Sequence, residues 1–409
     1  MTHIAKQALA RVKVLDFGWA IVGGLGSKYL GDHGAQVVRV ESITRPDLAR
    51  SNRFVSISEA TNPDDKPWFI QLNTSKYSIT INLKHSRARE VINRLIRWAD
   101  LVLENYTPGA MTKLGYDYEY MRSVKPDIIM ISGSAHGQTG PLAREWGIDG
   151  TGGAISGRTD LTGWPDRGPV FPSSVPYGDC VVGLVVPLAA IAALDYRRRT
   201  GKGQYIDVSM FDVCVHQIAP AVLDWQANKR LQTRTGNHIS YAAPHNVFPC
   251  LGDDRWCAIA VFTDEEWESF CSVIGNPLWT KQGKFSTLKS RKDNEDELET
   301  LIAEWTATHS AEEIMDLMQT AGVPAGIVQN AQDLFERDIQ LQERQFLVPL
   351  KNPVLGVVNH PTPPYKLLNT KAQVRTAPGL GEHTDYVCTQ LLGMDDKEFA
   401  ELFEQGIFE

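Results

Sequence analysis

The stretch VKVLDFGWAIVGGLGSKYLGDHGAQVVRVE (residues 12–41) decides the fold class of this 409-residue chain. An apolar strand at 12–17 leads through a glycine-rich segment into a helix at 27–34, and a second apolar strand follows at 35–41. A strand, a helix and a strand within such a short span are typical of two parallel strands joined by a crossover helix. The stretch therefore predicts an α/β fold with a parallel sheet.

The same alternation continues as far as residue 134. It predicts further strands at 77–83, 100–105 and 127–134, with a helix at 86–99. Because these strands are apolar on both faces, we expect them in the centre of a sheet that is covered by helices. Ligands of such sheets bind beyond the carboxyl ends of the strands. The residues just after the strands are therefore candidate ligand contacts: Trp19, Asn105, Tyr106 and Gly133.

The glycines after the first strand also suggest a dinucleotide site. They stand at Gly23, Gly24 and Gly26, and this spacing does not satisfy the G-x-G-x-x-G pattern of such sites. We therefore interpret them as packing glycines at a tight turn between strand and helix.

The texture of the sequence changes after residue 225, where tryptophans, polar turns, one strand and two helices follow. This pattern predicts a smaller α+β domain beside the α/β domain. The expected boundaries are a large domain at 1–205 and 330–409, a small domain at 225–320, and linkers at 205–225 and 320–350.

The composition limits the possible partners and location. A net charge of −8 argues against nucleic acid as a partner, although a local basic pocket remains possible. The six cysteines are scattered, which favours free thiols in a reducing cytoplasm over disulfides or a metal site. The first residues show no signal-type apolar segment. We expect a cytoplasmic protein with no membrane association.

A single carboxylate, Asp179, stands at the start of the apolar run PYGDCVVGLVVPLAAIAAL (176–194). The run has roughly fifteen apolar residues, too few for a membrane span, so it predicts a buried helix. Asp179 is then either a helix N-cap or a carboxylate held at a helix N-terminus as a nucleophile. This stretch alone leaves both interpretations open.

Motifs along nearly the whole chain resemble those of the class III CoA-transferases (formyl-CoA:oxalate type), a family that includes α-methylacyl-CoA racemase. They occur in the family's order: the opening stretch, SKYSITINLK (75–84), ADLVLENYTPGAMTKLGYDYEYM (99–121), GSAHGQTGP (133–141), GDCVVG (178–183), RRRTGKGQYIDVSMFD (197–212), APHNVFPC (243–250), GVPAGIV (322–328) and GLGEHTDYV (379–387). The resemblance implies a Rossmann-like large domain and a dimer of interlocked rings, either a homodimer or a heterodimer with a related subunit.

The resemblance also implies that Asp179 is the nucleophile, which forms an acyl anhydride and then an aspartyl-CoA thioester. The CoA thioester is a substrate, and no prosthetic group, metal or ATP is implied. At a helix N-terminus we expect the pKa of Asp179 to be lowered. The expected oxyanion donors are backbone N–H groups of 178–180 or 19–22.

Contacts with CoA carry over from the family to nine positions. They are Trp19, Ala20, Val22, Lys76, Asn105, Tyr106, Lys113, Arg144 and Met210. Arg45 and Arg50 are further cations that could pair with CoA phosphates.

The acceptor acid is expected to differ from oxalate. Oxalate-using members have a glutamine where this chain has Ile21, a Tyr-Glu pair where it has Trp146-Gly147, and a glycine-rich tract in place of 243–250. These exchanges remove polar groups, so we expect a larger, partly apolar acid, with benzylsuccinate-like compounds first and succinyl-CoA as the donor.

Two other functions are considered. Racemases resemble Gly-His-Asp where this chain has Gly147-Ile148-Asp149, and isoleucine cannot move a proton. A non-catalytic subunit that supports an active relative would be expected to lose Asp179, which is present.

Overall fold

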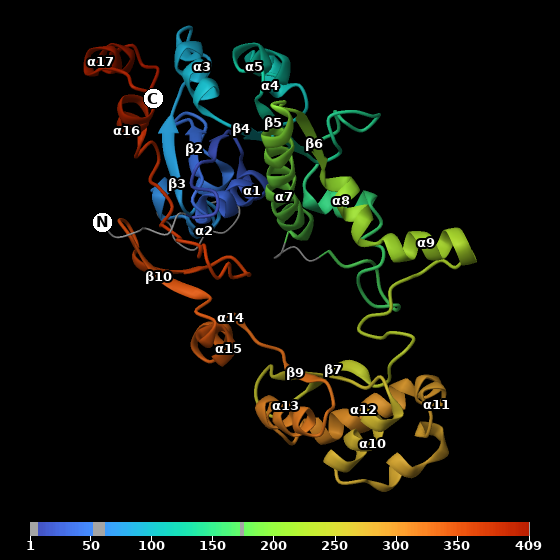
Figure 1. Cartoon of the computed structure of the whole chain (residues 1–409). Coiled ribbons are helices and arrows are strands. Elements are labelled where there is room, and N and C mark those ends of the chain that lie inside the picture. Colours follow the sequence, from blue (N-terminus) through green and yellow to red (C-terminus); the bar gives the residue numbers. More distant parts are fainter. Residues whose placement is uncertain (1–6, 52–61, 172–175, 409) are drawn as a thin grey trace. The chain divides into compact units, whose positions relative to one another are not determined.

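The computed structural model describes residues 7–51, 62–171 and 176–408, and its chain divides into two compact units (Figure 1). Unit 1 comprises residues 1–158, 171–223 and 341–409, and unit 2 comprises 159–170 and 224–340. The sequence placed 159–170 in the large domain. The structure assigns this segment to unit 2, where the N–H of Gly236 donates to the carbonyl of Gly163 at 2.8 Å.

Unit 1 is built on a six-stranded parallel sheet, which confirms the predicted α/β class. The strand order is β3-β2-β1-β4-β5-β6. The order reverses between β1 and β4, and ligands of such sheets bind at the carboxyl ends of the strands at this point. The strands are β1 (Lys13–Asp16), β2 (Gln36–Glu41), β3 (Lys76–Thr80), β4 (Leu101–Glu104), β5 (Ile129–Ser134) and β6 (Tyr205–Ser209).

Helices connect these strands, and a hairpin and two further helices follow near the C-terminus. The connecting helices are α1 (Ala20–Asp32), α2 (Pro67–Leu72), α3 (Ala88–Trp98), α4 (Ala110–Leu114), α5 (Tyr118–Val124), α6 (Asp149–Ile155) and α7 (Tyr177–Thr200). After β6 come α8 (Met210–Gln217) and α9 (Ala219–Asn228). The C-terminal elements are β10 (Leu347–Asn352), β11 (Gly356–Pro361), α16 (Thr384–Tyr386) and α17 (Asp396–Glu404).

Unit 2 contains a three-stranded antiparallel sheet packed against helices. This is the smaller α+β part that the sequence predicted near 225–320. Its elements are β7 (His245–Pro249), β8 (Trp256–Ala260), β9 (Ala325–Ile327), α10 (Asp264–Val273), α11 (Leu288–Asp293), α12 (Glu295–Thr306) and α13 (Ala311–Thr320). Two short helices, α14 (Ala331–Glu336) and α15 (Ile339–Glu343), lead back to unit 1.

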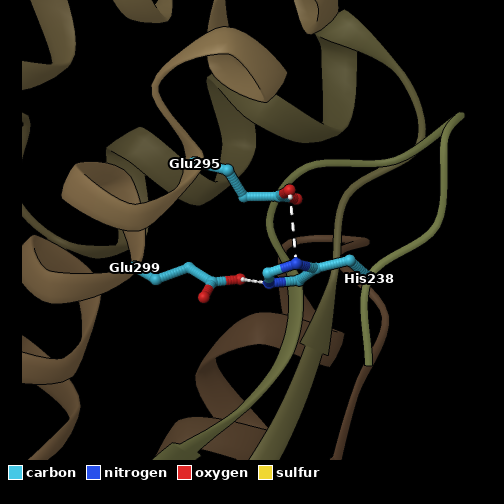
Figure 2. Close-up of side chains that lie close together, drawn as sticks. All are labelled: His238, Glu295 and Glu299. Atoms are coloured by element: carbon cyan, nitrogen blue, oxygen red, sulfur yellow. Dashed lines mark hydrogen bonds and ion pairs between the residues drawn. The ribbon is translucent and has the colours of Figure 1, made fainter. Parts of the chain in front are cut away.

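In unit 2 an ion-pair cluster joins the segment before β7 to α12. The ring of His238 lies between two carboxylates, with Glu299 at 2.8 Å from Nε2 and Glu295 at 3.5 Å from Nδ1 (Figure 2). Lys292 also pairs with Glu295 at 2.6 Å. The two carboxylates face different nitrogens of the ring, so the imidazole bridges two acidic side chains of α12.

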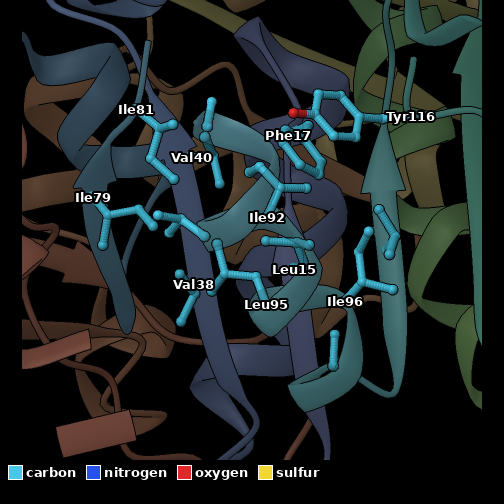
Figure 3. Close-up of a cluster of buried hydrophobic side chains, with 14 of the residues drawn as sticks. Leu15, Phe17, Val38, Val40, Ile79, Ile81, Ile92, Leu95, Ile96 and Tyr116 are labelled. Carbon is cyan, nitrogen blue, oxygen red and sulfur yellow. The ribbon is translucent and has the colours of Figure 1, made fainter. Parts of the chain in front are cut away.

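Both faces of the parallel sheet are buried, as the apolar strands predicted. On one face Leu15, Val38 and Ile79 pack against Ile92 and Leu95 of α3 (Figure 3). On the other face, side chains of β1, β2, β4 and β5 pack against α1 and α7. The sheet is therefore a rigid base for the loops at its carboxyl edge.

The glycine-rich segment after β1 lies inside α1, not before it, because this helix already begins at Ala20. A Cβ atom at Gly23 would lie 2.4 Å from the backbone of Gly18, and one at Gly24 would lie 2.9 Å from Leu72. The packing role predicted for these glycines is confirmed. They allow the first turns of α1 to approach neighbouring segments closely, and they do not form a turn before the helix.

Helix α7 is longer and less buried than the sequence predicted. It has 24 residues, and Val182, Val186 and Ala190 face the core. Leu188 on the other side is 69% exposed, so only one face of the helix is covered. Within the described residues it is the one helix with the length and hydropathy to cross a membrane, which by itself is weak evidence because core helices pass the same test.

Candidate functional site

The loops after β1 and β4 meet at the point where the strand order reverses. The side-chain oxygen of Asn105 accepts a hydrogen bond from the N–H of Trp19 at 2.6 Å, and its Nδ2 donates to the carbonyl of Trp19 at 3.0 Å. One amide side chain thus joins two segments that lie 86 residues apart in the sequence. The structure brings these two predicted ligand contacts together.

A cavity of about 570 Å³ opens beside this junction. Five of the predicted CoA contacts line it: Trp19, Ala20, Asn105, Tyr106 and Lys113. The rings of Trp19 and Tyr106 pack edge to face at 5.9 Å, and Arg45 lies 5.0 Å from the Trp19 ring. Arg45 and Lys84 also line the cavity. Aromatic faces beside three cations suit a ligand that combines an apolar part with several negative charges.

Ala20, which lines this cavity, has a left-handed backbone, with φ of +52°. Such a conformation costs an alanine on the order of 1 kcal/mol. Its N–H donates to Asp47 Oδ1 at 3.0 Å, and Asp47 in turn pairs with the fully buried Arg39. The left-handed conformation of Ala20 is therefore stabilised by a hydrogen bond to Asp47, whose carboxylate belongs to a buried ion pair.

A second, smaller cavity of about 90 Å³ adjoins the first, because Asn105 lines both. Val22, Met210 and Asp179 line it as well, and these are further predicted site residues. Gly133 also lines it, although this residue lies within β5 and not after the strand as the sequence predicted. The small cavity contains the predicted catalytic carboxylate of Asp179. It shares the lining residue Asn105 with the predicted CoA cavity.

Asp179 is the third residue of α7, whose N-cap is Pro176, so the N-cap interpretation is wrong. The expected fall of its pKa is also wrong. Burial, followed by repulsion from Asp149, raises the pKa of Asp179 to about 7, while Arg158 opposes the rise. Burial is the largest cause of this rise, because loss of hydration disfavours the ionised carboxylate.

Three of the cationic side chains that were expected to contact CoA line neither cavity. The ammonium group of Lys76 is buried and donates to Asp16, Asn73 and the carbonyl of Gly24, and burial lowers its pKa to about 8. Arg50 is buried with Glu41 and Asp64. Arg144 is exposed and lines neither cavity. A contact of Lys76 with CoA would require its buried network to open.

Several of the proposed oxyanion donors already have acceptors. Trp19 and Ala20 donate to the side chains of Asn105 and Asp47, as described above. The N–H of Gly178 donates to Asp149 at 2.5 Å, and that of Cys180 donates to the carbonyl of Pro176. Ile21, Val22 and Asp179 remain as candidates within the two stretches.

Only some of the residues on which the acceptor prediction rests line the cavities. Gly147 lines the small cavity. Trp146, by contrast, is 81% exposed, and Ile21 is buried without lining either cavity.

Sequence reasoning missed Lys84 as a lining residue, and it missed the pair Asp149–Arg158 beside Asp179. Lys84 ends the motif SKYSITINLK, which was a usable signal. Asp149 was considered only as part of a racemase motif, and no local pattern linked it to residue 178.

The chain matches known proteins along most of its length. The sequence model of CoA-transferase family III matches residues 9–384. The chain is 30% identical over 397 residues to the succinyl-CoA–D-citramalate CoA-transferase of Chloroflexus aurantiacus, with 97% of each chain covered. It is 28% identical over 400 residues to the succinyl-CoA–L-malate CoA-transferase beta subunit of the same organism, with 96% of each covered.

Among solved structures, a CAIB/BAIF family protein from Brucella suis superimposes with a TM-score of 0.86 at 28% sequence identity. The superposition covers 94% of this chain and 100% of that chain. Because the family match spans nearly the whole sequence and the fold agrees, the chain belongs to CoA-transferase family III and is an enzyme that transfers CoA.

Proposed function

We propose that this enzyme transfers CoA from succinyl-CoA to a carboxylic acid larger and less polar than oxalate, with Asp179 as the nucleophile. The observation that carries the proposal is the shared wall of the two cavities. The larger one has the aromatic and cationic lining that CoA needs, and the smaller one contains Asp179. A thioester that extends from the first into the second would bring its acyl carbon to the carboxylate.

The proposed reaction needs only carboxylates and the CoA thiol. Asp179 adds to the acyl carbon, the C–S bond breaks, and an aspartyl anhydride and CoA thiolate form. The thiolate then attacks the aspartyl carbonyl, which releases succinate and leaves an aspartyl-CoA thioester. The acceptor carboxylate attacks this thioester to give a second anhydride. The released thiolate attacks the acceptor's carbonyl carbon, which gives the new acyl-CoA and frees Asp179.

The raised pKa of Asp179 predicts the pH dependence of this reaction. Only the ionised carboxylate attacks, and its pKa is raised to about 7. We therefore expect kcat/KM for succinyl-CoA to rise about tenfold per pH unit below pH 7 and to level off above it, because kcat/KM reports the ionisation of the free enzyme. Initial rates between pH 5 and 9 check this. A profile that is flat down to pH 5 would mean that the group is ionised throughout.

The proposed acceptor and donor rest on two lines of support. Two relatives carry names with succinyl-CoA as the donor and a dicarboxylic acid as the acceptor. Gly147 lines the small cavity, and the family resemblance implies a glutamate at this position in oxalate-using members. An acid with an apolar part gains from burial at roughly 25 cal/mol per Å². Benzylsuccinate-like acids are therefore first among the candidates.

A panel of acids tests this proposal. The purified protein is incubated with succinyl-CoA and with benzylsuccinate, citramalate, malate, glutarate or oxalate, and the CoA esters are identified by mass spectrometry. We expect the benzylsuccinate ester to form fastest and the oxalate ester slowest. Preference for oxalate would contradict the acceptor proposal. Failure with every acid would indicate that a partner subunit completes the site.

A dimer is part of the proposal, with either a second copy or a related chain. The uncovered face of α7 carries three exposed apolar side chains, Leu184, Leu188 and Ile191. Exposed apolar faces of this kind mark interaction surfaces. One relative is named as a beta subunit, which supports a heteromeric form.

The six free cysteines, five of them buried, support a reducing cytoplasmic location.

A further inference from the structure

A second carboxylate, Asp149, is bound directly to the helix that carries Asp179. Asp149 is the first residue of α6 and is 4% exposed. Its Oδ1 accepts a hydrogen bond from the backbone N–H of Gly178 at 2.5 Å. Arg158 donates to both of its oxygens, at 3.1 and 3.2 Å. The carboxylate thus connects the start of α7 to the chain that follows α6.

The glycine at position 178 is what permits this contact. A Cβ atom there would lie 2.4 Å from Asp149 Oδ1 and 3.0 Å from the sulfur of Cys214. Any other residue would push the carboxylate away from the helix start. The glycine that precedes Asp179 in the sequence is therefore explained by Asp149.

We infer that Asp149, held by Arg158, is a positioning residue that fixes the first turn of α7 and sets the charge beside Asp179. This inference rests on the proposed role of Asp179 as the nucleophile. Asp149 takes one free N–H of the helix start, a task that the Asp179 side chain would otherwise compete for. The carboxylate of Asp179 is thereby left available to face the small cavity, which Asp179 lines.

The charges around Asp179 make this role of Asp149 measurable in the pH dependence of the reaction. After burial, the negative charge of Asp149 is the largest influence that raises the pKa of Asp179, and Arg158 lowers it. The other ionisable groups that interact with Asp179 are Cys180 on α7 and Cys214 on α8, and burial raises the pKa of both thiols. These thiols are neutral at working pH, so Asp149 and Arg158 carry the charges that matter.

The test is the pH profile of kcat/KM for succinyl-CoA in two variants. In Asp149→Asn the acid limb should move about one unit to lower pH, because a repelling charge is lost. In Arg158→Met the limb should move to higher pH, because Asp149 is no longer offset. Both variants should lose about tenfold in plateau kcat as the helix start loosens. Arg158→Lys, which keeps the charge, should return the limb to within a few tenths of a unit of wild type.

A matched control removes an ion pair away from the cavities. Glu398 pairs with Arg94 in the same unit, so Glu398→Gln should leave limb and plateau unchanged. A purely structural role for Asp149 would lower kcat without moving the limb, or would move it in the same direction in both variants, and either result overturns the inference. If Asp149→Asn does not fold, the two Arg158 variants decide between these roles. The acid limb should move to higher pH in Arg158→Met and stay near the wild-type position in Arg158→Lys. Activity retained in Asp179→Asn would contradict the nucleophile instead, so the two failures are distinguishable.

Discussion

Asp179→Asn is expected to reduce kcat for CoA transfer by about a thousandfold or more, because removing a covalent nucleophile costs orders of magnitude in rate. The variant should still fold, since asparagine has the same shape and Asp179 makes no capping hydrogen bond in α7. Initial rates of CoA-ester exchange, followed by chromatography, measure the effect.

The same variant should be more stable than the wild type at alkaline pH. The pKa of Asp179 is raised in the folded protein from 3.8 to about 7. Its contribution to stability is therefore present below pH 3.8 and is lost as the pH rises to 7, because in this range the carboxyl ionises in the unfolded chain but keeps its proton in the folded protein. Asparagine does not ionise. Melting temperatures should thus be higher for the variant at pH 8 and equal near pH 4.

The matched control for this experiment lies on the same helix. The exposed carboxylate of Asp195 bonds to Arg198 and Arg199. Asp195→Asn makes the same chemical change outside the cavities, and kcat should stay within about twofold, since exposed ion pairs contribute little. More than about a tenth of the wild-type activity in Asp179→Asn would contradict the nucleophilic role.

Gly23→Ala is expected to destabilise the protein by about 2 kcal/mol or more and to damage the CoA cavity. A Cβ atom at this position would lie 2.4 Å from the backbone of Gly18 and 2.8 Å from Asn105 Oδ1. Backbone cannot move aside as a flexible side chain can, so the helix start must shift. Because Asn105 holds the loop of Trp19, KM for succinyl-CoA should rise at least tenfold. Urea unfolding and steady-state kinetics measure the two effects.

Gly283→Ala is the control for the glycine substitution. A Cβ atom at Gly283 would meet nothing within 4 Å. We expect the free energy of unfolding to stay within about 0.5 kcal/mol of the wild type. A Gly23→Ala protein with wild-type stability and KM would show that the close approach of α1 to Gly18 is not required.

The fold was predictable because its signals are local. The alternation of apolar strands and helices gives the parallel sheet, and the residues after β1 and β4 lie at the reversal of strand order that such sheets use for ligands. The start of α1 was placed too late, because glycines in a sequence indicate a turn as often as close helix packing.

The electrostatics of the site were not predictable from local patterns. Lys76 resembles a phosphate-binding cation in sequence, but its acceptors Asp16, Gly24 and Asn73 meet it only in the folded sheet. The pKa of Asp179 depends on burial and on Asp149, which is 30 residues earlier in the chain. Burial and contacts between distant segments are properties of the fold, and a motif does not contain them.

The most direct test of the central claim is to find the CoA thioester on the enzyme itself. The protein is incubated with succinyl-CoA without an acceptor, quenched in acid, digested with trypsin and analysed by mass spectrometry. We predict an aspartyl-CoA thioester on the peptide of residues 168–197 that contains Asp179, convertible to a hydroxamate by hydroxylamine and absent from Asp179→Asn. A thioester on another residue would contradict the account, as would rapid transfer with no adduct on this peptide under any quench time.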